Sequence, residues 1–343
     1  MRRHRKGKKV LSPASILRNF RETSLTSSLN SSQRLYQSLK SEPNAKVCVL
    51  RRVGGIGDVL MMTPALKELK ARLPEIELTV GIDRHSTRGD VYYELLKNAP
   101  FIDELVDARY INRKKFSQCV DISAVCIPFE KKGFPSRNRI DLFSNYLGFQ
   151  KVEDKVPFYN RTQEEIDIAK SFYQKNFNEF GPVIAIHTAS NEKKRCWPLN
   201  QILSFIAYMK QEIPTIQFLM LDQNMICKEW SALKNVVPVY NSKIREMAAL
   251  IGECDIFIGP DSGPMHLAGA LKKKSVVVFG SVPPEARINH YALHRGVRMD
   301  ELKCIGCWYS KCHYNYKCMT DLAGARVGKI AKEHLLGSLN EKK

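Results

Sequence analysis

The chain has 343 residues, of which 44% are hydrophobic, and a formal net charge of +19. This apolar content excludes a disordered chain, and the length favours two domains of ordinary size. The sequence has no apolar run close to the ~18 residues that a membrane-spanning helix needs, and no sustained apolar segment follows its basic N-terminus, which argues against a secretory signal. We therefore expect a cytoplasmic protein.

The excess of Lys and Arg predicts an anionic partner. Residues 2–9 (RRHRKGKK) carry six of the positive charges, and the remainder of the chain is basic as well. Nucleic acid, an anionic membrane surface and a phosphorylated substrate all fit, and charge alone does not choose among them. We interpret residues 1–45, which are rich in Ser, Arg and Lys, as a flexible basic tail and rank this above a transit peptide.

Ordered structure is predicted from residue 46. A strand at 47–53 leads through a glycine turn into a helix whose apolar residues recur at helical spacing. Further strands are predicted at 77–83 and 122–129, where apolar runs recur. Residues 152–177 join this half to the next.

The second half repeats the same alternation of elements. The predicted elements are a strand at 182–189, a helix at 200–213, a strand at 217–223, a helix and strand within 244–259, and a last strand at 274–281. Strands that alternate with helices indicate a mostly parallel sheet. The fold class is therefore α/β, with two doubly wound domains facing a shared cleft, and ligands are expected at the carboxyl ends of the strands.

The stretch GGIGD follows the first strand. Gly54, Gly55 and Gly57 form a turn whose N–H groups can face a ligand. Neither the full dinucleotide fingerprint nor the P-loop pattern is present, which disfavours a dehydrogenase. Asp58 is either the N-cap of the helix or a general base on the floor of the cleft, and nothing local separates the two.

Two further motifs follow strands of the second half. HTASNEKKRCWP (187–198) combines hydroxyls with three consecutive cations, which is either a solvated basic loop or a seat for a diphosphate. GPDSGPMHLAGA (259–270) places Ser262 and Gly263 at a helix start, where an anion is stabilised. Asp261 suits loop shaping or a sugar hydroxyl better than a phosphate, and His266 is a core residue, a cap or a phosphate ligand. FGSVPPEAR (279–287) borders the same crevice.

Four of the ten cysteines cluster with the spacing C-x2-C-x4-C-x5-C, at Cys304, Cys307, Cys312 and Cys318. This spacing is typical of a structural zinc or iron site, and the alternative is four unliganded thiols. A catalytic metal is disfavoured because four thiolates leave no open position. The six scattered cysteines are interpreted as reduced thiols.

Taken in series, five stretches resemble the heptosyltransferase family of bacterial lipopolysaccharide synthesis, glycosyltransferase family nine. They are RRVGGIGDVLMMTPAL, RIDLFSNYLG, HTASNEKKRCWP, GPDSGPMHLAGAL and FGSVPPEAR, and the resemblance covers roughly residues 46–320. It implies a GT-B fold of two Rossmann-like domains around a central cleft. It also implies an inverting, metal-independent transfer from a nucleotide-diphosphate sugar, typically ADP-heptose, to a glycolipid acceptor.

The resemblance also implies roles for individual residues. Asp58 matches the catalytic base, Asp261 the acid that contacts the donor sugar, and either Lys194 or Arg195 the cation that neutralises the leaving diphosphate. Arg139, Gly55 and Gly57 fall on the acceptor side. The remaining residues expected to bind the donor are Thr188, Ser190, Glu229, Ser262, Gly263, Pro264, Met265 and His266.

These inferences divide the chain into a tail (1–45), an acceptor-side domain (46–165), a nucleotide-sugar domain with the cysteine cluster (166–320) and a C-terminal helix (321–343) that packs back on the N-terminal domain. The expected function is glycosyl transfer with no cofactor required, at the cytoplasmic face of the membrane. Two alternatives stay open. One is a transferase of the same fold whose acceptor is nucleic acid, gripped by the basic tail. The other is a non-catalytic interaction protein that retains the fold.

Overall fold

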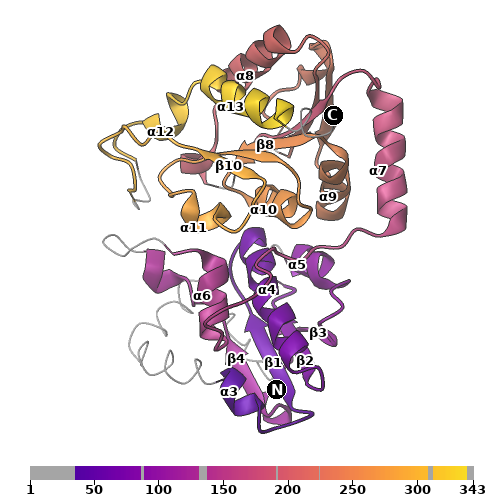
Figure 1. The fold of residues 1–343 in the computed structure, drawn as a ribbon, viewed down its shortest axis with the longest axis vertical. Coiled ribbons are helices and arrows are strands. Elements are labelled where there is room, and N and C mark those ends of the chain that lie inside the picture. Colours follow the sequence, from indigo (N-terminus) through magenta and orange to yellow (C-terminus); the bar gives the residue numbers. More distant parts are fainter. Residues whose placement is uncertain are drawn as a thin grey trace, which may run out of the picture.

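The computed structural model describes residues 35–85, 89–130, 137–190, 192–223, 225–307 and 312–337. These residues form two α/β domains, one above the other in Figure 1, with the N-terminal domain below. The helix α7 (Gln163–Asn176) runs along one side and leads from the first domain into the second. The α/β class and the two-domain arrangement predicted from the sequence are confirmed.

The N-terminal sheet has four parallel strands in the order β3-β2-β1-β4. The strands are β1 (Lys46–Arg51), β2 (Glu77–Ile82), β3 (Glu104–Asp107) and β4 (Gln118–Asp121). Residues 47–50 of the central strand β1 are at most 2% exposed. A parallel strand covered on both faces needs such a continuous apolar run. The helices of this domain are α4 (Ile56–Arg72), α5 (Gly89–Leu96) and α6 (Arg139–Tyr146), with short 3-10 turns η1 (Arg113–Lys115) and η2 (Ile127–Glu130).

The strand predicted at 122–129 is wrong. β4 ends at Asp121, and the chain then turns out of the sheet into η2. The backbone carbonyls of Ile122 and Ser123 accept hydrogen bonds from the buried guanidinium of Arg51, at 2.8 and 3.1 Å. Ile122, Val125 and Cys126 are buried in the turn instead, so the apolar run indicates burial and not strand conformation.

The C-terminal sheet has six parallel strands in the order β10-β9-β8-β5-β6-β7. They are β5 (Val183–His187), β6 (Gln217–Asp222), β7 (Val236–Tyr240), β8 (Ile256–Pro260), β9 (Ser275–Val278) and β10 (His294–Val297). The predicted last strand is therefore not the last, because β10 pairs beyond it at the edge. The edge strands β7 and β10 are less buried than the central ones.

Helices cover both faces of this sheet. One face carries α9 (Ile244–Glu253) and α10 (Gly263–Ala270), and its apolar core is continuous with that of the N-terminal domain. The other face carries α8 (Leu199–Glu212) and α13 (Gly324–Leu336), which form a separate core. The remaining elements are η3 (Lys193–Arg195), η4 (Trp230–Ala232), α11 (Glu285–Ile288) and α12 (Lys317–Thr320).

Two boundaries differ from the sequence-based division. Residues 35–39 of the predicted tail form the helix α3 (Leu35–Leu39), and its two leucines are buried in the first domain. The C-terminal helix α13 packs beside α8 on the second domain and not on the first (Figure 1), because its buried residues belong to the second core. Residues 1–34, which contain the basic arm, lie outside the described residues.

A buried arginine ties the two domains together. Arg245 on α9 donates hydrogen bonds to the backbone carbonyl of Glu94 at the end of α5 (2.7 Å) and to that of Asn160 in the connecting segment (3.0 Å). It also pairs with the carboxylate of Glu165 on α7. Within the part of the chain that the structure describes, no helix is both long and apolar enough to cross a membrane.

Candidate active site

A cavity of about 510 Å³ lies where the carboxyl ends of the two sheets face each other. A volume in this range holds a ligand of nucleotide size. The first domain contributes the turn after β1 and the start of α4 and α6, and the second domain contributes the ends of β5, β6 and β8 with the start of α9 and α10. The cavity is lined by residues 54–58, Met61, Val91, Arg139, His187, Ala189, Ser190, Glu192, Arg195, Gln223, Ser242, Ile244, Met247, residues 261–264, His266 and Arg287.

Glycines let the two domains approach at the floor of this cavity. Gly54 has a φ of +135°, a conformation that an L side chain rarely adopts, and it turns the chain from β1 into α4. Gly57 faces the ring of His266 so closely that a Cβ would collide with it. Gly263 at the start of α10 likewise meets Ile56 of α4, because a Cβ added to Gly263 would stand only 2.7 Å from the Cβ of Ile56.

Asp58, in the first turn of α4, is buried and bound through both carboxylate oxygens. Its Oδ2 accepts a hydrogen bond from the Gly55 N–H at 2.8 Å and lies 3.1 Å from Nη2 of Arg51. Its Oδ1 pairs with Nη1 of Arg139, at the start of α6. Burial by itself would raise the pKa of Asp58, but Arg139, Arg51 and the Gly55 N–H together hold it well below its usual range. The carboxylate is therefore ionised at any working pH.

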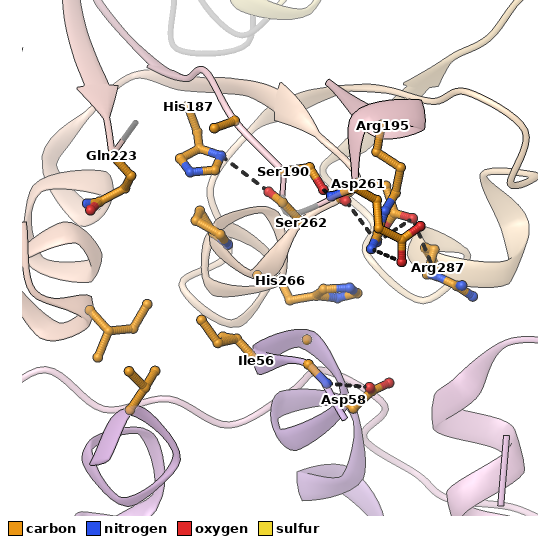
Figure 2. A pocket seen from close by; sticks show the side chains of 18 of the residues that line it. Ile56, Asp58, His187, Ser190, Arg195, Gln223, Asp261, Ser262, His266 and Arg287 are labelled. Carbon is orange, nitrogen blue, oxygen red and sulfur yellow. Dashed lines mark hydrogen bonds and ion pairs between the residues drawn. The ribbon is translucent and has the colours of Figure 1, made fainter. Parts of the chain in front are cut away.

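A second buried carboxylate, Asp261, belongs to the other domain. Figure 2 shows it between Arg195 and Arg287, joined to both. Arg195 reaches it at 3.4 Å and also donates to its backbone carbonyl at 3.1 Å. Burial opposes its ionisation, but the two arginines keep the pKa of Asp261 below its usual value.

Hydroxyl and imidazole groups line the same wall. Ser262, just before α10, lies 3.3 Å from Nδ1 of His187 at the end of β5, as Figure 2 shows. Burial lowers the pKa of His187 to about 4 and that of His266 to about 3, so both rings are neutral near pH 7. With Ser190 and the N–H groups at the start of α10, they offer donors to an anion without adding charge.

A tyrosine behind His266 decides which nitrogen of that ring carries the proton. The Tyr291 hydroxyl and Nδ1 of His266 are 2.7 Å apart and buried. Burial raises the pKa of Tyr291, so the phenol keeps its proton. A phenol O–H is a stronger donor than a neutral imidazole N–H, and imidazole nitrogen is the better acceptor. Nδ1 therefore accepts from Tyr291, and the proton sits on Nε2, on the side of the ring that faces the cavity.

One end of the cavity combines apolar and amide groups. Gln223 directly follows β6, and its amide nitrogen donates to the backbone carbonyl and the hydroxyl of Ser242, at 2.9 and 2.7 Å. Ile244 and Met247 on α9 complete this end. A planar apolar ring with polar edges, such as a nucleobase, matches this lining.

Most of the predicted site residues meet in this cavity. They are Gly55, Gly57, Asp58, Arg139, Ser190, Arg195, Asp261, Ser262, Gly263, Pro264 and His266. Both cations pair with Glu192, Arg195 at 3.0 Å and Lys194 at 3.2 Å, but of the two it is Arg195 that lines the cavity and also contacts Asp261.

Three other predicted donor residues lie elsewhere. Thr188 is buried and donates to the carboxylate of Asp222 at 3.0 Å. Met265 is in the apolar core, and Glu229 is exposed on the loop after β6. Asp222 also accepts from Ile226 N, Cys227 N and the Trp230 indole, so it holds that loop in place.

Several lining residues were not predicted. Gln223 and His187 stand at the ends of parallel strands, and that position alone could have singled them out. Arg287 lies in the quoted stretch FGSVPPEAR but received no role. Ile244 and Met247 carry no chemical signal in the sequence, because apolar residues at a helix start are ordinary core residues.

The four clustered cysteines line a second cavity, of about 320 Å³, together with His313. The Sγ of Cys312 accepts hydrogen bonds from the backbone N–H groups of Tyr314 and Tyr316, at 3.4 and 3.3 Å. Burial and the neighbouring thiols raise the pKa of Cys318 to about 11. Among the residues described, no three His, Cys, Asp or Glu side chains are arranged to hold a metal ion. Residues 308–311, inside the cluster, lie outside the described part.

Residues 139–315 match the sequence profile of glycosyltransferase family 9 (heptosyltransferase). The chain belongs to glycosyltransferase family 9. This confirms the resemblance seen in the motifs and, with it, the class of enzyme.

Known proteins agree with this assignment. The chain is 35% identical over 101 residues to lipooligosaccharide heptosyltransferase 2 of Campylobacter jejuni, a match that spans 28% of this chain and 30% of that relative. The solved family 9 glycosyl transferase of Veillonella parvula has a TM-score of 0.68 at 19% identity, covering 86% of this chain and 98% of the other. The iron-containing heptosyltransferase TibC of enterotoxigenic E. coli, in complex with ADP-D-beta-D-heptose, has a TM-score of 0.61 at 14% identity, covering 87% and 77%. These structures confirm the GT-B fold of this family 9 chain.

Replacing Tyr291 by Phe tests the proton position on His266. The ring packing should survive, but Nδ1 loses its donor, and the preference for the Nε2–H form should fall. In ¹⁵N-histidine-labelled protein, the His266 signals of wild type should show a protonated Nε2 and a bare Nδ1, and those of the variant should move toward a mixture. A variant spectrum identical to wild type would show that Tyr291 does not set the tautomer.

Proposed function

We propose that the chain is an inverting, metal-independent glycosyltransferase that moves heptose from ADP-heptose to a hydroxyl of a lipopolysaccharide-core acceptor. One observation carries the proposal: a buried carboxylate of the first domain, Asp58, shares a cavity with the anion-binding groups of the second. Two of the proteins named above, that of Campylobacter jejuni and TibC, are heptosyltransferases, and TibC was solved with ADP-D-beta-D-heptose.

The donor is assigned to the wall of the second domain. The diphosphate would lie at the start of α10, where the helix dipole, Ser262, Ser190 and Arg195 stabilise its charge. The nucleobase would occupy the end formed by Gln223, Ile244 and Met247. Asp261 would then accept hydrogen bonds from hydroxyls of the sugar.

In the transfer step, an acceptor oxygen attacks the anomeric carbon as its proton passes to Asp58 Oδ1. The bond from that carbon to the phosphate oxygen breaks, and ADP leaves with the electron pair. A single displacement inverts the anomeric centre because nucleophile and leaving group lie on opposite sides. The base and the phosphate-binding groups come from opposite domains, which supports this geometry. Arg195 and the helix dipole stabilise the leaving diphosphate.

We also place the enzyme at the cytoplasmic face of a membrane, where a glycolipid acceptor is held. The net charge of +19 supports attraction to an anionic surface.

The donor assignment is tested with ADP. We expect ADP to raise the melting temperature of the wild-type protein, and Arg195→Ala to weaken ADP binding by about ten- to a hundredfold, since it removes a charge-assisted contact. The matched control is Lys194→Ala, which removes the neighbouring cation outside the cavity and should bind ADP like wild type. If no nucleoside diphosphate stabilises the protein, the donor site is misassigned.

The base assignment is tested with Asp58→Asn. Transfer should fall by about 10²- to 10⁴-fold because the amide cannot take the proton, whereas ADP affinity should change little. Glu68→Gln is the control, since Glu68 is a buried carboxylate on the same helix that pairs with Arg72 away from the cavity. Transfer by Asp58→Asn at the wild-type rate would exclude Asp58 as the base.

We propose in addition that Cys304, Cys307, Cys312 and Cys318 hold a structural zinc or iron ion. The four thiols line one cavity, and two N–H groups are directed at the Cys312 sulfur, which is the chemistry of a thiolate site. Because the described side chains do not surround a common point, binding the ion would have to draw them together. TibC is described as iron-containing, which supports this. When bound, the ion would cross-link this loop and take no part in the transfer.

Elemental analysis checks the metal. Wild type should carry about one zinc or iron ion per chain, and the double variant Cys304→Ser/Cys307→Ser should carry none and melt at a lower temperature. Cys227→Ser, outside the cluster, should keep the full metal content. A metal-free wild-type protein purified without chelators would rule the ion out.

A further inference from the structure

Both oxygens of the carboxylate proposed as the base are already engaged by described residues. Oδ2 is held by the Gly55 N–H and Arg51, and Oδ1 is paired with Arg139. An acceptor hydroxyl must hydrogen-bond to one of these oxygens before it can give up its proton. A carboxylate oxygen can accept more than one hydrogen bond, so Arg139 crowds Oδ1 without saturating it. The two guanidinium groups against the carboxylate also make Asp58 a weak base, and transfer is favoured when one of the two arginines withdraws.

The two arginines differ in how they are held. The side chain of Arg51 is only 4% exposed, and its Nη1 is fixed to the carbonyls of Ile122 and Ser123. Its guanidinium also lies over the ring of Phe143, 5.2 Å from the centroid. Arg51 therefore cannot leave without disrupting the end of the sheet, and it keeps Oδ2 in place.

Arg139 is the arginine that can move. It stands in the first turn of α6, lines the cavity, and its side chain is 18% exposed. Oδ1, the oxygen it covers, is the one that an acceptor entering from the cavity would use. A guanidinium exchanges one carboxylate for another, or for a phosphate, at little net cost when the new pairing is bidentate.

We propose that Arg139 guards Asp58, that is, that it covers Oδ1 of Asp58 in the absence of acceptor. An anionic group of the acceptor draws the Arg139 side chain away from Oδ1. This inference rests on the proposed function. The guard makes Asp58 available as a base only when the bound acceptor carries a carboxylate or a phosphate near its reacting hydroxyl. Water alone does not recruit Arg139, so the guard suppresses hydrolysis of the bound donor. Arg139 is thereby a specificity-determining residue for anionic acceptors.

The guard is tested by hydrolysis of ADP-heptose without acceptor, followed as ADP release. Arg139→Gln should hydrolyse the donor about tenfold faster than wild type, because Oδ1 is then open to activate water. Arg139→Lys, which keeps the cation, should stay near the wild-type rate. The gain should vanish in the double variant Arg139→Gln/Asp58→Asn. Arg137→Gln is the matched control, since Arg137 lies two residues earlier and outside this cavity.

Stimulation of hydrolysis by small anions is a second test of the guard. At saturating donor and constant ionic strength set by chloride, acetate or inorganic phosphate should stimulate wild-type hydrolysis several-fold and leave Arg139→Gln unchanged. The more effective anion identifies the group that the acceptor carries. Stimulation by neither, together with no acceleration in Arg139→Gln, overturns the guard.

The pH profile checks the charge contact between Arg139 and Asp58 on which the guard depends. Asp58 is surrounded by Arg51, Arg139 and Arg287, with neutral His266 above it and Asp261 across the cavity. Removing the positive charge of Arg139 raises the pKa of Asp58, so the acid limb that Asp58 sets, which lies below the working range in wild type, should rise toward that range in Arg139→Gln. An unmoved limb contradicts the proposal. If wild type neither binds ADP nor turns over ADP-heptose, the proposed function itself fails, whereas normal binding and turnover without acceleration in Arg139→Gln removes only the guard.

Discussion

The site depends on the stabilisation of one buried negative charge. A carboxylate as buried as Asp58 loses several kcal/mol of hydration unless cations and N–H groups replace the water. Arg51, the last residue of β1, is one of these cations. Its guanidinium also donates hydrogen bonds to the two backbone carbonyls that follow the neighbouring strand β4. The end of the sheet, the glycine turn and the start of α4 are thus fixed by a single charge cluster. A mobile carboxylate on an exposed loop would lack this orientation.

The second domain repeats this arrangement with different elements. Asp261, directly after β8, is buried between Arg195 and Arg287, as Asp58 is between Arg51 and Arg139. The cavity is therefore lined by charges that already have partners. The proposed anionic ligand would bind by exchange of these partners and not by occupying unpaired cations. This lets the cleft be strongly charged and still stable, since both buried carboxylates are paired.

Much of the fold was readable from the sequence because central parallel strands are continuous apolar runs and their turns carry glycine. The failures have physical causes. Residues 122–129 have the composition of a buried strand. Arg51 binds the backbone carbonyls of Ile122 and Ser123, the first of them 71 residues away in the sequence, and this contact cannot be predicted from local composition. The edge strands are only partly buried: β10 (HRGV) lacks an apolar run, and β7 (VVPVY) is interrupted by a proline. Among site residues, Ser190 and Thr188 look alike in sequence, yet only the partner Asp222 decides that Thr188 faces inward. Gln223 and Arg287 required knowing where strands end in space.

The width of the cleft depends on two glycines that lack a Cβ where the two domains meet. Gly57 of α4 abuts His266, and Gly263 of α10 abuts Ile56, so two missing methyl groups bring the domains together from opposite sides. A Cβ at either position would act as a spacer between α4 and α10. The charged residues would all remain, but the distance from the proposed base, Asp58, to the opposite wall would grow, and the proposed transfer, which requires atoms about 3–3.5 Å apart, would be lost. These two glycines therefore set the separation between Asp58 on one wall of the cleft and Asp261 on the other.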